Sequence, residues 1–269
     1  MADPDNAEAF TGSIPKIYGT YLVPLLFEPY AADLAARVAA RSPKNVLEIA
    51  AGTGVVTRAM LAALPPTVVI IATDLNTAML EQAAAYTLPR PVAFEQADAM
   101  DLPFDDQTFD AVVIQFGVMF FPDKPKALSE ARRVLRPGGA LIFNVWDRIE
   151  QNEFAEVITT ALAEFFPDDP PMFLPRTPYG YFDHGRIASD VAAGGFGTPE
   201  MVVVAARSIA KNASDPAVAY CHGTPLRAEI EARGGLEHAT DAAQKALEAR
   251  FGAGPIDAKI QAHVVTVQR

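Results

Sequence analysis

The sequence predicts an α/β fold in which parallel strands alternate with helices, and three observations support this prediction. A short apolar strand over 46–49 leads into a turn of small residues, 50–54. From Val55 the apolar spacing becomes helical. Strand and helix patterns then alternate as far as Trp146. This alternation requires parallel strand pairing with right-handed crossovers, so helices are expected on both faces of the sheet.

Composition narrows the class of protein. Half of the 269 residues are hydrophobic, which is enough for a large core. The net charge of −11 argues against a nucleic-acid partner, because phosphate binding needs clustered Lys and Arg. The single cysteine, Cys221, excludes an intrachain disulfide and a thiolate metal cluster, so no metal site is predicted. Residues 1–9 lack the apolar segment of a signal peptide, and no stretch is long enough to span a membrane, so we expect a cytoplasmic protein.

The chain before the first strand is expected to be a helical cover. Residues 1–13 are predicted to be a loose start, and 14–40 a helix interrupted at Pro24 and Pro29. Its aromatic side chains, including Tyr18, are expected to pack on the core; the alternative is a lid over a bound ligand.

The central part of the chain is expected to supply five strands and the helices between them. Asn76 or Thr77 is the expected N-cap of the second of these helices. The predicted strands are 46–49, 68–73, 92–96, 109–115 and 140–146, and the predicted helices are 55–63, a segment from 77 to about 88, and 123–135.

After Trp146 the alternation stops. We expect an amphipathic helix over 153–166, an ordered proline-rich excursion over 167–184, and a short helix over 187–193. The remaining predicted elements are a strand over 201–206, helices within 215–252 and a closing strand over 262–267. With no internal repeat, the chain is predicted to be one domain, 1–269, comprising a helical cover (1–44), a cofactor-binding core (45–146) and acceptor-side insertions with closing strands (147–269).

The small-residue turn and the acids at the strand ends indicate the kind of ligand. A dinucleotide fingerprint needs a third glycine at the position of Thr57, which this chain lacks. Asp74 follows the second strand, 20 positions after Gly54, where a ribose-binding acid is expected. Glu48, beside the turn, would repel a pyrophosphate and favour a cationic ligand; bonding to the loop amides is the alternative.

A third acid follows the next strand. Asp98 could accept a hydrogen bond from an exocyclic amine while the backbone N–H of Ala99 meets a ring nitrogen; capping a turn is the alternative. Acids at three strand ends suit an adenosine with a cationic tail better than one carrying phosphates.

In combination, these stretches resemble the class I S-adenosylmethionine-dependent methyltransferases, especially the small-molecule group of ubiquinone/menaquinone-type (methyltransferase type 11) enzymes. Ala50 is a departure, because many members carry glycine there, and we expect the change to be mild. The resemblance implies a Rossmann-like sheet of seven strands, mostly parallel with an antiparallel last strand, and extra helical cover from the N-terminus and from insertions after strands 5 and 6. The matching stretches are 46–54, 72–74 with 79–80, 96–99, 109–113 and 135–139.

The resemblance also implies S-adenosyl-L-methionine as cofactor and a division of roles among the site residues. The turn would contact the methionine moiety, the second strand end the ribose, the third the adenine, and the fourth would border the sulfonium and the acceptor. The implied cofactor-binding residues are Glu48, Ala50, Gly52, Thr53, Gly54, Asp74, Leu75, Met79, Asp98, Ala99, Met100, Gln115 and Phe116.

The acceptor is expected to be a small, uncharged or aromatic molecule methylated at oxygen, carbon or nitrogen. The Asn/Asp-Pro-Pro-Tyr motif of members that methylate base amines or glutamine amides is replaced by 115–118 here. Aromatic residues of 116–121 and 165–182 could form an apolar pocket, although core packing explains them equally well. If the acceptor must lose a proton, the candidate bases are His184, His222, Tyr179 and Tyr181, and structural hydrogen bonding is their alternative role.

Two other functions compete with this prediction. An NAD-dependent oxidoreductase would need the third loop glycine and a catalytic Tyr/Lys pair on a helix, and neither is found. A non-catalytic domain that binds the adenosyl ligand would carry the same motifs. The sequence leaves open whether the protein is a monomer or a homodimer.

Overall fold

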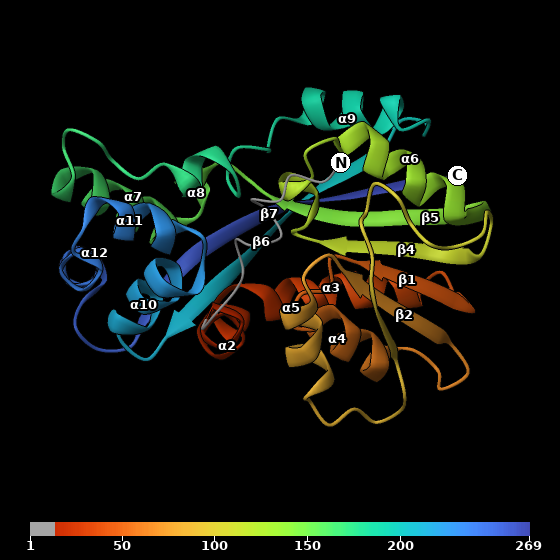
Figure 1. Cartoon of the computed structure of the whole chain (residues 1–269), viewed down its shortest axis with the longest axis horizontal. Coiled ribbons are helices and arrows are strands. Elements are labelled where there is room, and N and C mark those ends of the chain that lie inside the picture. Colours follow the sequence, from red (N-terminus) through yellow and green to blue (C-terminus); the bar gives the residue numbers. More distant parts are fainter. Residues whose placement is uncertain (1–13) are drawn as a thin grey trace.

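The computed structural model describes residues 14–269 and contains a seven-stranded sheet in the order β3-β2-β1-β4-β5-β7-β6 (Figure 1). Strands β1 to β5 pair in parallel, and β7 pairs antiparallel with both β5 and β6. The predicted seven-stranded sheet with an antiparallel last strand is therefore confirmed. The strands are β1 Asn45–Ile49, β2 Val69–Asp74, β3 Ala93–Gln96, β4 Phe109–Gln115, β5 Leu135–Trp146, β6 Glu200–Ala210 and β7 Ile256–Gln268.

Helices cover both faces of the parallel part of the sheet, as expected. Neighbouring strand residues point to opposite faces, so Val46 is buried in one apolar cluster and Leu47 in the other. Helices α3 (Glu28–Ala39) and α4 (Val55–Ala63) pack against each other in the first cluster, and α6 (Lys124–Val134) and α9 (His184–Ala193) pack in the second. Helix α5 (Thr77–Ala84) contacts β2 and β3 and begins at the predicted cap, Asn76, whose side chain accepts from the N–H groups of Ala78 and Met79.

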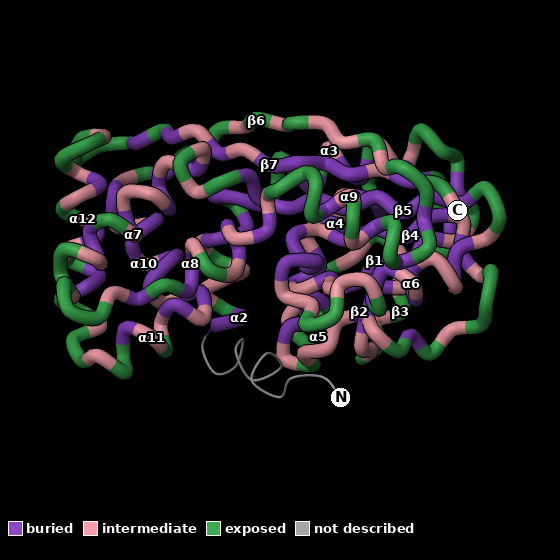
Figure 2. Tube along the Cα trace, turned by 90° about the horizontal axis from the view of Figure 1, so that it is seen from above, coloured by how far each residue is buried: buried purple, intermediate pink, exposed green. Residues whose placement is uncertain are grey.

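A helical layer surrounds the far ends of β6 and β7 (Figure 1). It comes from insertions after β5 and β6, as predicted. Figure 2 shows buried residues in this layer as well as in the sheet, and one apolar cluster runs through both. No helix within residues 14–269 has the length and apolar character needed to cross a membrane. The helices of the layer are α7 Glu153–Phe165, α8 Phe173–Arg176, α10 Ser214–Gly223, α11 Leu226–Arg233 and α12 Leu236–Phe251.

The expected interruptions of the first helix are wrong. Helix α2 (Ile14–Ile17), a π-helix labelled η1 (Tyr18–Phe27) and α3 follow one another without a break. Pro29 lies at the junction of η1 and α3, where the hydrogen bonds change from the π to the α pattern, so the missing N–H interrupts no regular α-helical ladder. Pro24 lies inside η1, whose wider turns accommodate the ring. The predicted loose start at 1–13 lies outside the described residues.

Two details of the predicted strands differ from the structure. The fifth strand begins at Leu135 rather than Ala140, because the Pro-Gly-Gly segment stays in the sheet with a register shift against β4. The second strand is not buried along its whole length: Val69 is 53% exposed, because β3 begins to pair with β2 only at Ile71.

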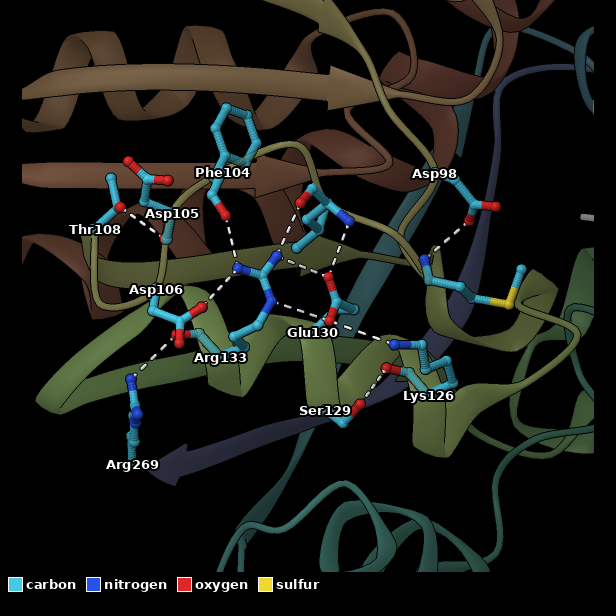
Figure 3. A network of polar contacts seen from close by, with 12 residues as sticks. Asp98, Phe104, Asp105, Asp106, Thr108, Lys126, Ser129, Glu130, Arg133 and Arg269 are labelled. Carbon is cyan, nitrogen blue, oxygen red and sulfur yellow. Dashed lines mark hydrogen bonds and ion pairs between the residues drawn. The ribbon is translucent and has the colours of Figure 1, made fainter. Parts of the chain in front are cut away.

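A buried ion pair on α6 fixes the loop that follows β3 (Figure 3). The guanidinium of Arg133 donates to Glu130 Oε2 at 2.8 Å and to the carbonyl oxygens of Leu102 and Phe104 at 2.8 and 2.7 Å. Glu130 also accepts from the N–H of Leu102 at 3.0 Å. The loop carrying Asp98 is thus held on α6.

We expect Arg133→Met to lower the free energy of unfolding by about 1–3 kcal/mol at neutral pH, because it removes the nearer cation of the buried Glu130 carboxylate and leaves only Lys126, at 3.4 Å. Hydrogen bonds from Arg133 hold the pKa of Glu130 below its ordinary value. That stabilisation is present above the ordinary glutamate pKa and is lost as the pH falls through the lowered one. Urea unfolding at several pH values measures it.

The matched control is Arg132→Met, since Arg132 lies on the same helix and has no hydrogen bond or ion pair within 14–269. Equal stability losses for the two variants, or a loss that does not shrink in acid, would contradict the account.

Candidate functional site

A crevice lies at the carboxyl ends of β1, β2 and β4, and the loop after β3 also lines it. Parallel strands bring their carboxyl ends to this one edge of the sheet. Its empty space is about 940 Å³, part of it open to solvent. The lining residues predicted from the sequence are Ala50, Gly52, Asp74, Leu75, Met79, Asp98, Ala99, Met100, Gln115 and Phe116. Others that line it are Tyr18, Ile49, Asn76, Ala97, Gly117, Phe120, Phe121 and Pro122.

The turn after β1 is built from residues with left-handed backbone. Gly52 has φ 56°, Gly54 has φ 76° and Ala50 has φ 56°. The N–H of Ala51 donates to the carbonyl of Thr73 at 2.9 Å, which ties the turn to β2. Left-handed backbone costs a residue with a Cβ about 1 kcal/mol, so the alanine at position 50 carries strain that the expectation of a mild change did not include.

The Asp74 carboxylate lies between the turn and the end of β2. Its Oδ2 accepts from the N–H of Gly52 at 2.8 Å, and its Oδ1 accepts from the N–H of Asn76 at 2.9 Å. Burial raises the pKa of Asp74, and these backbone hydrogen bonds counteract the rise. An acceptor-rich carboxyl group therefore lines the crevice at the predicted place.

Glu48 lies where burial disfavours its negative charge in the ligand-free protein. Its side chain is buried below the turn, where Oε2 accepts from the hydroxyl of Thr57 at 2.5 Å, and burial raises its pKa to about 8. Near neutral pH most of the population is therefore protonated. Glu48 lies outside the crevice and borders a smaller cavity that Thr53 also lines. Gly54 follows Thr53 in the chain and is the N-cap of α4.

Asp98 combines the two roles considered from the sequence. One carboxyl oxygen, Oδ1, accepts from the N–H of Met100 at 2.9 Å and caps the turn after β3 (Figure 3). The side chain also lines the crevice next to Ala99. The turn contact engages Oδ1, and no hydrogen bond to Oδ2 is formed within residues 14–269.

An apolar chamber of about 480 Å³ adjoins the crevice, and the two share Tyr18, Phe116 and Phe120. Phe116 and Trp146 stack with ring centroids 3.8 Å apart and planes at 9°. Aromatic residues from both predicted stretches, 116–121 and 165–182, form part of its wall. The lining residues are Tyr18, Leu22, Leu26, Phe27, Phe116, Phe120, Trp146, Phe173, Leu174, Pro178, Tyr179, Tyr220, Thr224 and Pro225.

Most of the candidate bases lie away from both cavities. His184 contacts His263 Nδ1 through Nε2 at 3.1 Å, and His222 Nε2 contacts the hydroxyl of Thr240 at 2.9 Å. The hydroxyl of Tyr181 donates to Asp190 at 2.7 Å. Structural hydrogen bonding, the alternative role considered for the candidate bases, therefore describes these three side chains. Tyr179 alone among the candidates lines the chamber, and burial raises its pKa well above the ordinary value, which disfavours a base.

Sequence reasoning missed Trp146 and Tyr220 and left Tyr18 undecided between core and lid. Trp146 and Tyr220 come from segments far apart in the chain, and no local pattern connects them. Tyr18 lines both cavities, as the lid alternative requires.

Comparisons with known proteins agree with the geometry. Residues 47–143 match the family model described as "Methyltransferase domain". The chain is 37% identical over 131 residues to the ubiquinone/menaquinone biosynthesis C-methyltransferase UbiE of Ectopseudomonas mendocina, covering 47% of this chain and 51% of that one. The chain thus spans about half the length of the curated relatives it matches.

Among solved structures, the YcgJ protein of Bacillus subtilis is similar with a TM-score of 0.57 and 21% identity, over 90% of this chain and 99% of that one. The [4+2]-cyclase SpnF is similar with a TM-score of 0.53 and 18% identity, over 88% and 81%. Both likenesses concern the fold. The predicted resemblance of the segment 47–143 to the class I methyltransferases, and to the ubiquinone/menaquinone-type C-methyltransferases among them, is confirmed.

Replacing Glu48 with Gln tests the buried, protonated state. A glutamate with a raised pKa in the folded protein loses stability as the pH rises from its unfolded pKa, about 4.3, towards the folded value of about 8. Glutamine cannot ionise. We therefore expect Glu48→Gln to gain at least about 1 kcal/mol relative to the wild type between about pH 5 and about pH 8, in denaturant unfolding without ligand.

The exposed Glu95→Gln is the control and should leave the pH profile unchanged. Parallel profiles for the wild type and Glu48→Gln would show that Glu48 is ionised throughout this range.

Proposed function

We propose that this chain is an S-adenosylmethionine-dependent methyltransferase acting on a small, uncharged, apolar or aromatic acceptor. The observation that carries the proposal is the pair of adjoining cavities. One places the strand-end carboxyl groups of Asp74 and Asp98 among mainly apolar side chains, the other is aromatic and aliphatic, and Phe116 and Phe120 belong to both. A methyl donor bound in the first cavity would face an acceptor bound in the second at the boundary that Phe116 and Phe120 share.

The crevice suits an adenosyl ligand. The Asp74 carboxyl group can accept hydrogen bonds from ribose hydroxyls, and Asp98 from an adenine amine. Met79 and Leu75 provide apolar surface for the adenine ring. A cationic ammonium group near the turn would also favour ionisation of Glu48, so the negative charge below the turn would develop on binding.

The chain's contribution to the reaction would be alignment. When bound, the cofactor supplies a methyl group already activated by its sulfonium sulfur. The aromatic walls exclude water and orient the acceptor, and no general base is required for an acceptor that is already nucleophilic. The raised pKa of Tyr179 and the distant positions of His184 and His222 agree with this mechanism.

The acceptor class is inferred from the chamber. The residues that line it, all within 14–269, include no Asp, Glu, Lys, Arg or His, so a charged acceptor would be desolvated without a partner. The relatives are named as C-methyltransferases of ubiquinone/menaquinone biosynthesis. This name agrees with an aromatic acceptor and favours methylation at carbon over oxygen or nitrogen. We also propose that the whole chain acts as one domain, since a single apolar cluster joins the sheet to the helical layer.

The competing functions are less well supported. Thr57, at the position of the missing loop glycine, donates to Glu48, which fits packing of α4 rather than pyrophosphate binding. A non-catalytic adenosyl-binding domain would not need an aromatic chamber next to the crevice.

Calorimetry with three ligands separates these functions. We expect S-adenosylmethionine and S-adenosylhomocysteine to bind and NADH not to bind. Product formation is then measured by mass spectrometry with a panel of small phenols, quinols and amines. Binding of NADH alone would contradict the proposal, and cofactor binding without product across the panel would favour the non-catalytic domain.

We expect Asp74→Ala to weaken S-adenosylhomocysteine binding by about 1–3 kcal/mol, the scale of a lost charge-assisted hydrogen bond. Because Asp74 also holds the turn, Asp74→Asn is a second variant that can keep an oxygen acceptor, and a smaller loss is expected for it. The control is Asp105→Ala, in the loop after β3 but outside the crevice lining. An unchanged dissociation constant for Asp74→Ala would remove Asp74 from the site.

A further inference from the structure

Two tyrosine hydroxyls form a polar spot in the apolar chamber. The hydroxyl oxygens of Tyr179, after α8, and Tyr220, on α10, are 3.2 Å apart. The two residues are only 3% and 2% exposed, and both line the chamber. They come from the two different insertions, so the spot exists only because the insertions pack together.

The pair has more hydrogen-bonding capacity than it uses. Each hydroxyl has one proton to donate and two lone pairs, and the contact between them uses one proton and one lone pair. Neither hydroxyl has another hydrogen-bond partner within residues 14–269. One buried O–H donor is therefore left over, and a buried donor without an acceptor costs free energy.

The hydroxyl of Thr224, which also lines the chamber, is already engaged. The hydroxyl of Thr224 donates to the carbonyl of Tyr220 at 2.7 Å and accepts from the N–H of Leu226 at 3.2 Å. The rest of the chamber is mainly aromatic and aliphatic, with the stacked rings of Phe116 and Trp146 on one side. A flat molecule with one oxygen matches this combination of walls and donor.

We propose that the Tyr179–Tyr220 pair anchors the acceptor, so that the chamber selects neutral aromatic compounds carrying a hydroxyl or carbonyl oxygen. The pair donates a hydrogen bond to that oxygen, and the ring extends towards the wall shared with the crevice. This inference rests on the proposed function, because it assigns a role in the same acceptor site. Burial raises the pKa of both tyrosines, so both hydroxyls keep their protons at neutral pH and serve as anchor rather than base.

The single tryptophan of the chain, Trp146, lines the chamber and reports on its occupancy. Tryptophan fluorescence is titrated with phenol, benzene and benzoate in the presence of S-adenosylhomocysteine. We expect phenol to bind about 3- to 10-fold more tightly than benzene, the effect of one net hydrogen bond, and benzoate to bind more weakly than either. The double variant Tyr179→Phe/Tyr220→Phe removes both O–H donors, so it should abolish the preference for phenol and leave benzene binding unchanged, whereas either single variant keeps one free donor.

Tyr181→Phe is the matched control, because the Tyr181 hydroxyl bonds Asp190 and its side chain does not line the chamber; the wild-type preference should persist in it. An equal affinity for phenol and benzene in the wild type, no phenol binding, or an unchanged preference in the double variant would overturn the anchor. Calorimetry of S-adenosylhomocysteine with each variant tests the proposed function separately. If that ligand does not bind, the proposed function fails, and titrations without it still decide whether the pair recognises an oxygen.

Discussion

The crevice depends on the two hydrogen bonds that the Asp74 carboxylate accepts from Gly52 and Asn76. They join the turn after β1 to the end of β2, and a third bond, from the N–H of Ala51 to the carbonyl of Thr73, closes the same seam. Left-handed backbone in the turn is what directs the Gly52 N–H at this carboxylate. The carboxyl group proposed to recognise the ribose therefore also holds the loop proposed to receive the methionine moiety, so ligand binding and loop geometry are coupled through one side chain.

A left-handed backbone conformation also shapes the boundary between the two cavities. Phe116 has left-handed backbone with φ 49°, and its N–H donates to the side-chain oxygen of Asn144 on β5 at 2.9 Å. Residues with a Cβ adopt this conformation only where their surroundings enforce it. Here it accompanies stacking of the Phe116 ring on Trp146, which places one aromatic side chain on the boundary of both cavities. Two of the four non-glycine residues with positive φ within 14–269, Ala50 and Phe116, thus lie at the proposed site.

Much of the fold could be predicted from the sequence, because strand and helix periodicities are local. The strand ends carrying Asp74 and Asp98 follow from them directly. The raised pKa of Glu48 could not be predicted, because it depends on burial below the turn, which outweighs the hydrogen bonds to Thr57 that lower the pKa. Continuity of the first helix through Pro24 was missed because proline usually ends a helix and the π-helical geometry has no simple sequence pattern. The chamber could be predicted only as a set of aromatic stretches. Its pairing of Tyr179 with Tyr220 depends on the packing of two insertions.

A crystal structure with S-adenosylhomocysteine bound tests the central claim most directly. The account predicts that the ribose hydroxyls lie within hydrogen-bonding distance of Asp74, that the adenine lies beside Asp98 and Ala99, and that the sulfur faces Phe116. A crevice left empty by this compound, or one that instead holds a dinucleotide pyrophosphate over Gly52 and Gly54, would contradict it.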